Sequence, residues 1–473
     1  MTAKGRKGKS IAMSVQIYEV RESQYDRGDT GERRKGAFEE KKEKGVVEAS
    51  WLRKQGVVSY DPGYTNTACC TSRITYLDGE RGILRYRGYP IEQLAGKSSF
   101  LEVAYTLYYG ELPTEQDLRL YEANVAAHRT PHNDLLKIIS NGFRSDAHPM
   151  GVLASTVMAM GTLYPEVNPA LQGNHVYESY KVREKQVFRI LGTMPMLVAS
   201  IYRSQNGLAP MVGFDTDDMT FTERFLCALS WAEGKQYKPN KRLARALDIL
   251  FILHADHELN CSTATMRQLT SSGVDVYTSV AASIGALYGP LHGGATEAVL
   301  KMLERIKTVD NIPAFLNAVK NREEKLMGFG HRVYRNYDPR AKIIKKIAYE
   351  VFEEVGQVDP LIDLATELER AALTDEYFVK RKLYPNVDFY SGLIYKAIGF
   401  PTEYFPCLFA IGRTAGWLAH WNEFLVDPEK KIARPTQLYK GHGKRDYVQV
   451  FSRWGKRHNS RISSQVFAGR LKK

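Results

Sequence analysis

The sequence predicts an all-α protein with a short β ribbon near its N-terminus. From residue 99 onward, apolar residues recur at the helical period in one segment after another, whereas strand-like segments are confined to residues 56–88. A chain of 473 residues with 44% hydrophobic and 25% charged residues can bury a large core. This composition excludes the collagen-like, disordered and disulfide-scaffold classes.

Three segments predict the strands of the ribbon. Residues 57–60, 72–77 and 82–87 are rich in Val, Ile, Leu and Tyr, and the turn sequences Asp61-Pro-Gly and Asp78-Gly separate them. The preceding residues 1–55 alternate short charge blocks with little apolar periodicity, which indicates a solvated extension.

Helices are predicted throughout the main body. Ser99 and Glu102 form a capping box that opens the first helix, which ends at Gly110. Asp338-Pro-Arg starts a later helix, whose apolar face ends at Gly356. Further helices are expected at residues 115–128, 150–163, 185–203, 221–232, 241–259, 278–288, 295–306, 314–326, 359–372, 389–398 and 404–420.

The formal net charge of +13 lies at the two ends of the chain. Residues 1–55 carry an excess of five positive charges and residues 440–473 an excess of nine, which leaves residues 56–439 close to neutral. Nucleic-acid binding by the folded body would require a basic face on that body. We therefore expect no nucleic-acid partner.

The sequence predicts a protein without a membrane span, in a compartment that keeps thiols reduced. The uncharged stretch 147–165 contains His148 and Pro149, so a buried helix is expected there. Five cysteines without CxxC spacing indicate free thiols. The first residues are basic and free of acid up to Tyr18, which favours the mitochondrial matrix. A peroxisome or glyoxysome and a bacterial cytoplasm are the alternatives, although the chain has no Ser-Lys-Leu ending.

Two short sequences approach known binding motifs without matching them. Gly96-Lys97-Ser98 lacks the leading glycine of a phosphate-binding loop. His254, His257 and Glu258 stand in the order His-x-x-His-Glu, whereas a zinc protease motif requires His-Glu-x-x-His. We therefore expect no metal site.

Polar residues at positions where an all-α core should be apolar indicate the candidate site. His257 follows the apolar run 249–253, and His292 and His331 lie in glycine-rich turns, while Asp388 stands between two apolar residues. One such residue usually has a structural role, but seven together favour an active site. The seven are His257, His292, His331, Arg340, Asp388, Arg413 and Arg434.

These residue types predict a carbon–carbon condensation. Desolvation would raise the pKa of Asp388 and make it an effective general base near neutral pH. A neutral histidine N–H beside glycine, as at His292 and His331, can stabilise charge that develops on a carbonyl oxygen. Each of the three arginines can hold a carboxylate with two hydrogen bonds. The expected reaction is an aldol- or Claisen-type condensation on a small di- or tricarboxylate.

Seven motifs, in order along the chain, resemble the citrate synthase family. The resemblance covers roughly residues 56–446 and is closer to the type II form common in bacteria and plant peroxisomes. The motifs are Asp256-His-Glu-Leu-Asn260, Gly289-Pro-Leu-His-Gly-Gly294, Gly328-Phe-Gly-His-Arg-Val-Tyr334, Tyr337-Asp-Pro-Arg340, Pro385-Asn-Val-Asp-Phe-Tyr-Ser-Gly392, Gly412-Arg-Thr-Ala-Gly-Trp417 and Ile432-Ala-Arg-Pro435.

The resemblance implies a role for each candidate residue. Asp388 would take a methyl proton from acetyl-CoA while His292 stabilises the enol. His331 would polarise the ketone of oxaloacetate, and citryl-CoA would then be hydrolysed. The residues that would bind oxaloacetate or citrate are His257, Arg340, Arg413 and Arg434.

The resemblance also implies an assembly and a domain organisation. Arg434 would reach the site from a partner subunit, so a homodimer or higher homo-oligomer is expected, with no metal or redox cofactor. Members of the family close a small domain over oxaloacetate, which excludes water. The expected division is an extension at 1–55, a large domain at 56–295, a small domain at 296–403, a return to the large domain at 404–446, and a basic extension at 447–473.

Two other functions stay open on the sequence. A 2-methylcitrate synthase would use the same motifs with propionyl-CoA in place of acetyl-CoA. A non-catalytic assembly protein could carry the same fold and bind partners through its basic ends. Thr436 stands where many type II relatives have Arg, which leaves any allosteric or CoA-phosphate role at that position in doubt.

Overall fold

The computed structural model describes residues 49–209, 218–230, 237–356 and 360–453. The chain divides into two compact units, residues 1–72 and residues 73–473. In the first unit, α1 (Ala49–Lys54) is followed by a segment without regular secondary structure. The predicted strand at 57–60 is therefore wrong. Val57, Val58 and Tyr60 are exposed there, and no neighbouring strand supplies backbone partners among the described residues.

The second unit begins with the predicted ribbon. Strands β1 (Thr75–Asp78), β2 (Ile83–Tyr86) and β3 (Tyr89–Pro90) form an antiparallel sheet in that order, and Thr75 pairs with Tyr86. The β1–β2 turn lies against a later loop. A Cβ at Gly79 would stand 2.1 Å from the carbonyl oxygen of Val333, and the N–H of Arg335 donates to Gly79 O at 2.8 Å.

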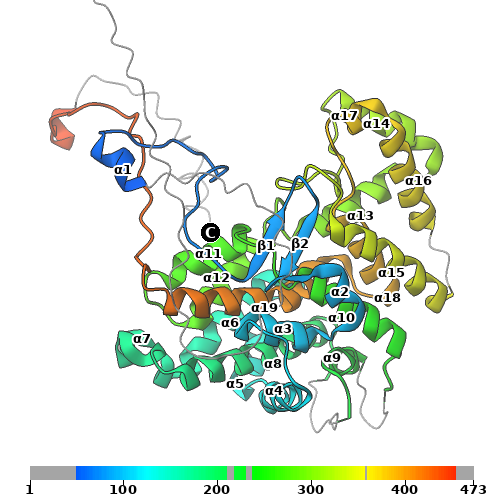
Figure 1. The fold of residues 1–473 in the computed structure, drawn as a ribbon, viewed down its shortest axis with the longest axis horizontal. Helices are drawn as coiled ribbons and strands as arrows, with labels where there is room; N and C mark the ends of the chain where they lie inside the picture. Colours follow the sequence, from blue (N-terminus) through cyan, green and yellow to red (C-terminus); the bar gives the residue numbers. More distant parts are fainter. Residues whose placement is uncertain (1–48, 210–217, 231–236, 357–359, 454–473) are drawn as a thin grey trace, which may run out of the picture. The chain divides into compact units, whose positions relative to one another are not determined.

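Helices form the other regular secondary structure in the described residues of this unit, as predicted (Figure 1). In chain order they are α2 (Ile91–Lys97), α3 (Phe100–Tyr109), α4 (Glu115–Ala127), α5 (Asn133–Asn141), α6 (Pro149–Met160), α7 (Pro169–Gln172), α8 (Tyr180–Gln205), α9 (Phe221–Ser230), α10 (Lys241–His254), α11 (Cys261–Thr270), α12 (Val276–Tyr288), α13 (Ala295–Ile306), α14 (Ile312–Lys320), α15 (Pro339–Val355), α16 (Pro360–Thr374), α17 (Glu376–Lys380), α18 (Val387–Ile398) and α19 (Phe405–Val426). Short 3-10 turns occur at Gly161–Leu163, Pro165–Val167, Asn174–Tyr177, Val309–Asn311, Thr402–Tyr404 and Val450–Ser452.

The predicted helix ends hold where a cap is encoded in the sequence. The Ser99 side chain accepts a hydrogen bond from the N–H of Glu102, and Asp338 caps α15 by accepting from the N–H of Arg340. Gly356 adopts the left-handed conformation that ends α15. Helix α10 ends at His254, five residues before the predicted end, because the chain turns sharply to place the next residues in the site.

Helix α19 is the centre of the core. Every residue from Phe405 to Trp421 is buried, and most of them are apolar, as expected for an element enclosed by others. It packs against α3, α8, α10, α11 and α12, and Figure 1 shows it crossing this group of helices. Within the described ranges, no helix is long and apolar enough to cross a membrane.

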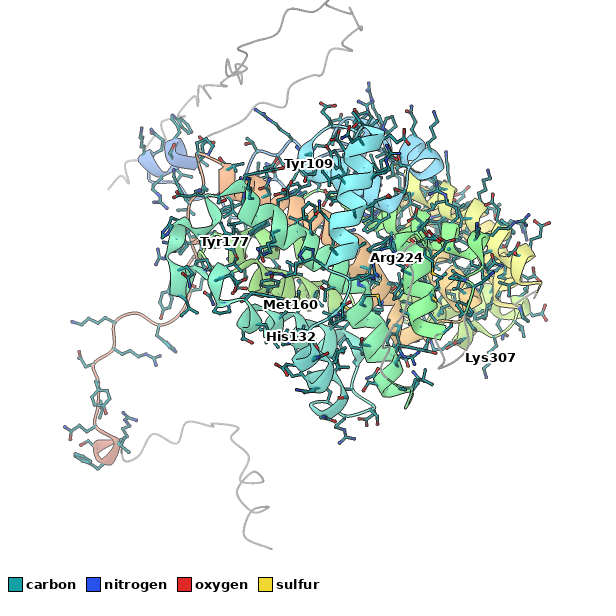
Figure 2. The ribbon with its side chains drawn as sticks, turned by 90° about the horizontal axis from the view of Figure 1, so that it is seen from below. Tyr109, His132, Met160, Tyr177, Arg224 and Lys307 are labelled. Atoms are coloured by element: carbon teal, nitrogen blue, oxygen red, sulfur yellow. The ribbon has the colours of Figure 1, made fainter. Side chains whose placement is uncertain are left out.

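Helices α13 to α18 gather on one side of this unit (Figure 1). Helices α14, α16 and α17 lie together in Figure 1, and α15 packs along α18. Figure 2 shows the unit turned by 90°, with Tyr177 near one side and Lys307, which follows α13, at the other. The proposed small domain at 296–403 includes all these later helices, but residues 73–473 form one compact unit, so its boundaries stay a prediction.

Candidate active site

The loop after α10 places His257 at the candidate site. The hydroxyl of Tyr86 donates to Asp256 O at 2.8 Å and accepts from Asp256 N at 3.2 Å. The Asp256 carboxylate is fully buried and accepts from the Thr75 hydroxyl at 2.5 Å. The β ribbon therefore fixes this loop, and His257 Nε2 lies 3.2 Å from the hydroxyl of Tyr334.

His331 faces His257 from the loop before α15. Their ring centroids lie 5.1 Å apart at an interplanar angle of 69°. Nδ1 of His331 accepts from the backbone N–H groups of Val333 at 3.0 Å and Tyr334 at 3.2 Å, so this nitrogen carries no proton. Burial, and next the positive charge of Arg340, lower the pKa of His331 to about 4. The ring is therefore neutral at physiological pH, and its proton is on Nε2.

His292 has the opposite tautomer. The backbone N–H of Ser262 donates to His292 Nε2 at 3.3 Å, and the Ser262 hydroxyl lies 2.9 Å from the same nitrogen. Because a backbone N–H can only donate, Nε2 is unprotonated and the proton is on Nδ1. Burial, and next the charge of Arg413, lower the pKa of His292 to about 3. A neutral N–H donor results here too.

Ser262 is a site residue that the sequence analysis did not identify. Its hydroxyl donates to Asn260 Oδ1 at 2.8 Å and accepts from Trp417 Nε1 at 3.1 Å, and its side chain is fully buried. It opens α11, a helix that was not predicted because its first residues, Cys-Ser-Thr-Ala-Thr, have no apolar period. The available signal was Asn260, which caps this helix from within a recognised motif.

Asp388 lies in the first turn of α18. Asn386 caps the helix and accepts from the N–H of Asp388 at 3.0 Å. Oδ1 of Asp388 is enclosed, and no residue in the described ranges gives it a hydrogen bond. Burial raises the pKa of this carboxyl from 3.8 to about 7, against the opposing pull of the Arg340 charge. The predicted general base thus titrates near neutral pH, for the predicted reason.

Two of the three predicted arginines are buried in the cluster. Arg413 on α19 donates from Nε to His254 O at 2.6 Å, whereas its enclosed Nη1 has no hydrogen-bond partner in the part of the chain that the structure describes. Burial lowers the pKa of Arg413 to about 10. Arg340 donates to both carboxylate oxygens of Asp338, from Nε at 3.1 Å and Nη2 at 2.9 Å. One edge of Arg340 is therefore already occupied.

Electrostatic interactions connect these side chains. The pKa of His257 is lowered well below its usual range, first by burial and then by four neighbours from the predicted set. The carboxyl of Asp388 is within the influence of Arg340 and Arg413. The structure therefore brings six of the seven predicted residues into one cluster. His257, Arg340 and Arg413 are buried in it, whereas His292, His331 and Asp388 are half-buried.

Arg434 does not join the cluster within one chain. It lies in the segment 428–449, which follows α19, contains no helix or strand and is exposed throughout. The N–H of its neighbour Ala433 donates to the Ser271 hydroxyl at 2.9 Å. The prediction that this arginine comes from a partner subunit stays untested by a single chain.

The residues of the rejected zinc motif have other partners. His254 Nδ1 lies 3.3 Å from the Tyr395 hydroxyl, and its ring packs 4.1 Å from that of Phe409. Among the residues with described positions, no group of three or more His, Cys, Asp or Glu side chains is arranged to hold a metal ion. Cys227 and Cys407 are buried thiols, and Cys261 is an exposed thiol.

The cluster can stabilise negative charge at two neutral histidines and remove a proton at one carboxylate. The family model described as citrate synthase, C-terminal domain, matches residues 63–436. Peroxisomal citrate synthase of Dictyostelium discoideum is 58% identical over 398 residues, which are 84% of this chain and 80% of that protein. Glyoxysomal citrate synthase of Cucurbita maxima is 55% identical over 413 residues, 86% of this chain and 79% of that protein.

Solved structures agree with these matches. Citrate synthase of Thermoplasma acidophilum, in a ternary complex with carboxymethyl coenzyme A and oxaloacetate, superposes with a TM-score of 0.76 at 31% identity. The match covers 84% of this chain and all of that one. Citrate synthase of Pyrobaculum aerophilum gives a TM-score of 0.74 at 35% identity and covers 83% of this chain and 95% of that one. The chain belongs to the citrate synthase family, and it is an acyltransferase.

Proposed function

We propose that this cluster condenses acetyl-CoA with oxaloacetate and water to give citrate and CoA. The observation that carries this proposal is the pair of neutral histidines with opposite tautomers in one cluster with a carboxyl that titrates near pH 7. Such a set can remove a weakly acidic C–H proton and stabilise two oxygen atoms that gain negative charge.

The first step is enolisation of acetyl-CoA. Ionised Asp388 takes a proton from the methyl group, and the Nδ1–H of His292 donates to the thioester oxygen as that oxygen gains charge. The hydrogen bond from Ser262 to Nε2 keeps the proton of His292 on the nitrogen that faces the substrate. In the second step the enol carbon attacks the ketone carbon of oxaloacetate, and His331 donates its Nε2 proton to the new alkoxide. The proton that Asp388 took from the methyl group is then passed through solvent to His331, so that both groups return to their starting protonation states. Water then hydrolyses the thioester bond and releases CoA.

The arginines supply the charge that oxaloacetate requires. Arg413 presents a buried Nη1 group that has no hydrogen-bond partner among the described residues, and a buried cation of this kind is costly unless an anion pairs with it. One substrate carboxylate binds there. Arg340, held by Asp338 at the start of α15, adds its positive charge beside the dipole of the helix N-terminus.

We propose that the functional unit is a homodimer or higher homo-oligomer in which Arg434 completes the site of the partner. Apolar side chains on the exposed arm after α19 support this proposal, because solvent exposure of so many is unfavourable in a monomer. Tyr439 and Phe451 are 71% and 70% exposed. The other exposed apolar residues of this arm are Ile432, Leu438, Tyr447, Val448 and Val450.

We propose the peroxisome as the compartment. The relatives from Dictyostelium discoideum and Cucurbita maxima are named peroxisomal and glyoxysomal, and the comparisons give no support to the mitochondrial matrix. Fractionation of source cells with an antibody against the full chain tests this. Co-sedimentation with a peroxisomal marker supports the proposal, and co-sedimentation with a matrix marker contradicts it.

Release of free thiol from acetyl-CoA, with and without oxaloacetate, tests the reaction. Wild type should release thiol only with oxaloacetate, and Asp388→Ala should lose this activity by roughly 10²–10⁴-fold. Asp363→Asn, which changes an exposed carboxylate on α16, is the matched control and should retain full activity. Propionyl-CoA is run in parallel, and a preference for it would assign the 2-methylcitrate reaction instead. If folded wild type releases no thiol from either acyl-CoA, the remaining function is that of a non-catalytic assembly protein.

A further inference from the structure

Glu369 on α16 is a buried carboxylate outside the cluster of substrate-binding residues. Its side chain is 3% exposed, and both oxygens are engaged. Oε1 accepts from the Tyr337 hydroxyl at 2.6 Å. Oε2 accepts from the Tyr390 hydroxyl and from Lys345 Nζ, the latter at 2.7 Å. The three donors come from three different parts of the chain.

Two of the donors lie close in the sequence to residues of the active site. Tyr390 is two residues after Asp388 on α18, and it is 1% exposed. Tyr337 immediately precedes Asp338, the residue that caps α15 and holds Arg340 by two hydrogen bonds. A single carboxylate thus joins the helix of the base to the loop of the arginine.

The third donor fixes the carboxylate itself. Lys345 lies on α15, five residues after Arg340, and its ammonium also lies 5.8 Å from the ring centroid of Tyr390. Hydrogen bonds to an ionised acceptor are shorter and stronger than those between neutral groups, and the Lys345 pairing lowers the pKa of Glu369, so this acceptor stays ionised. Helices α15, α16 and α18 are therefore connected through one charged centre.

We propose that Glu369 is a positioning residue that sets the placement of Asp388 relative to Arg340 through Tyr390 and Tyr337. The proposal rests on the proposed function, because these two residues act on the two different substrates. Displacement of a catalytic group by about 1 Å can cost roughly 10²-fold in rate. Tyr390 connects Glu369 to the helix that carries the base Asp388, and Tyr337 connects it to the loop before Arg340.

The two connections have different kinetic signatures. Tyr390→Phe removes the bond between Glu369 and the helix of Asp388, so kcat and the exchange of acetyl-CoA methyl protons into deuterated water should fall about tenfold with little change in the KM for oxaloacetate. Tyr337→Phe removes the bond to the loop of Arg340, so the KM for oxaloacetate should rise about tenfold with a smaller change in kcat. If Glu369 had only a structural role, both variants would have lower melting temperatures, but the loss would not divide into a kcat effect for Tyr390→Phe and a KM effect for Tyr337→Phe.

Glu369→Gln is the direct test, since glutamine keeps the shape but loses the charge and one acceptor. We expect a loss of roughly 10–100-fold in kcat/KM for the folded variant. Glu367→Gln, on the same helix in a more exposed pair with Arg370, is the matched control and should match wild type. Wild-type kinetics for Glu369→Gln would overturn the proposal.

If Glu369→Gln fails to fold, the kinetics of the two tyrosine variants test the proposal instead. The positioning role is overturned if Tyr390→Phe does not act mainly on kcat and Tyr337→Phe does not act mainly on the KM for oxaloacetate. Failure of wild type to condense the two substrates would refute the proposed function itself, which is a distinguishable result.

Discussion

Asp388→Asn should make the protein more stable while it removes activity. Burial raises the pKa of the folded carboxyl from 3.8 to about 7, a shift of about 3 pH units, and each unit corresponds to ~1.36 kcal/mol. The folded state therefore binds this proton more tightly than the unfolded state does. Wild type loses stability as pH rises from about 4 to about 7, and the penalty is complete above that range. Asparagine carries no charge and avoids the penalty.

The expected stabilisation by asparagine grows from about 2 kcal/mol at pH 5 to about 4 kcal/mol at pH 8. An unfolding entropy of ~2.1 cal/mol/K per residue gives about 1 kcal/mol/K for this chain, so the apparent melting temperature should rise by roughly 4 °C at pH 8. Thermal scans of both proteins at one protein concentration and one scan rate measure the difference. Thiol release should fall by roughly 10²–10⁴-fold in the same samples.

Two results would refute this reasoning. Equal melting temperatures for wild type and Asp388→Asn at pH 8 would mean that the carboxylate is solvated in the folded protein. Activity within tenfold of wild type would mean that another group removes the proton. Asp363→Asn changes an exposed carboxylate and should alter neither quantity, which controls for the change in net charge.

Three further outcomes are expected. In wild type, kcat/KM should fall about tenfold per unit as pH drops below about 7, because protonated Asp388 cannot accept the methyl proton, and a profile from pH 5.5 to 9 checks this. Ser262→Ala should cost about 1–3 kcal/mol of unfolding free energy in denaturant titrations, because Trp417 Nε1 loses its buried acceptor, whereas kcat should change little because the backbone N–H that fixes the His292 tautomer is kept. Gly79→Ala should raise the KM for oxaloacetate, since the new methyl group would displace the loop at Val333.

The sequence was sufficient for the parts of the fold that depend on local signals. The caps at Ser99, Asp338 and Gly356 place helix ends correctly, because one side chain or one left-handed glycine determines each end. The ribbon was predicted at β1 and β2 from alternation and turn residues. The strand predicted at 57–60 failed because a strand also needs a partner, which local sequence does not supply.

The site residues also divide into those that local sequence identifies and those that it does not. Six of them were identifiable because glycine, histidine, aspartate and arginine interrupt apolar segments that would otherwise continue. Ser262 and Glu369 were not identifiable, because each lies on an ordinary helix and acquires its role from side chains far away in the chain. Ser262 meets His292 at a separation of 30 residues, and Glu369 meets Tyr337 at a separation of 32. The tautomer of His292 and the placement of Asp388 relative to Arg340 thus depend on tertiary contacts, which no local sequence pattern encodes.

The arrangement of charge in the cluster indicates how the site combines stability with reactivity. Asp388 and Arg413 carry opposite charges and influence one another, yet Oδ1 of the acid and Nη1 of the arginine have no hydrogen-bond partner within the described residues. A buried charge without a close partner destabilises the fold, and apolar side chains in both places would avoid that cost. Leaving them apart keeps the carboxyl basic enough to take a carbon-bound proton and leaves the guanidinium available for a substrate carboxylate. The bound substrate then supplies the compensation that the empty fold lacks, so binding energy is used where the reaction takes place.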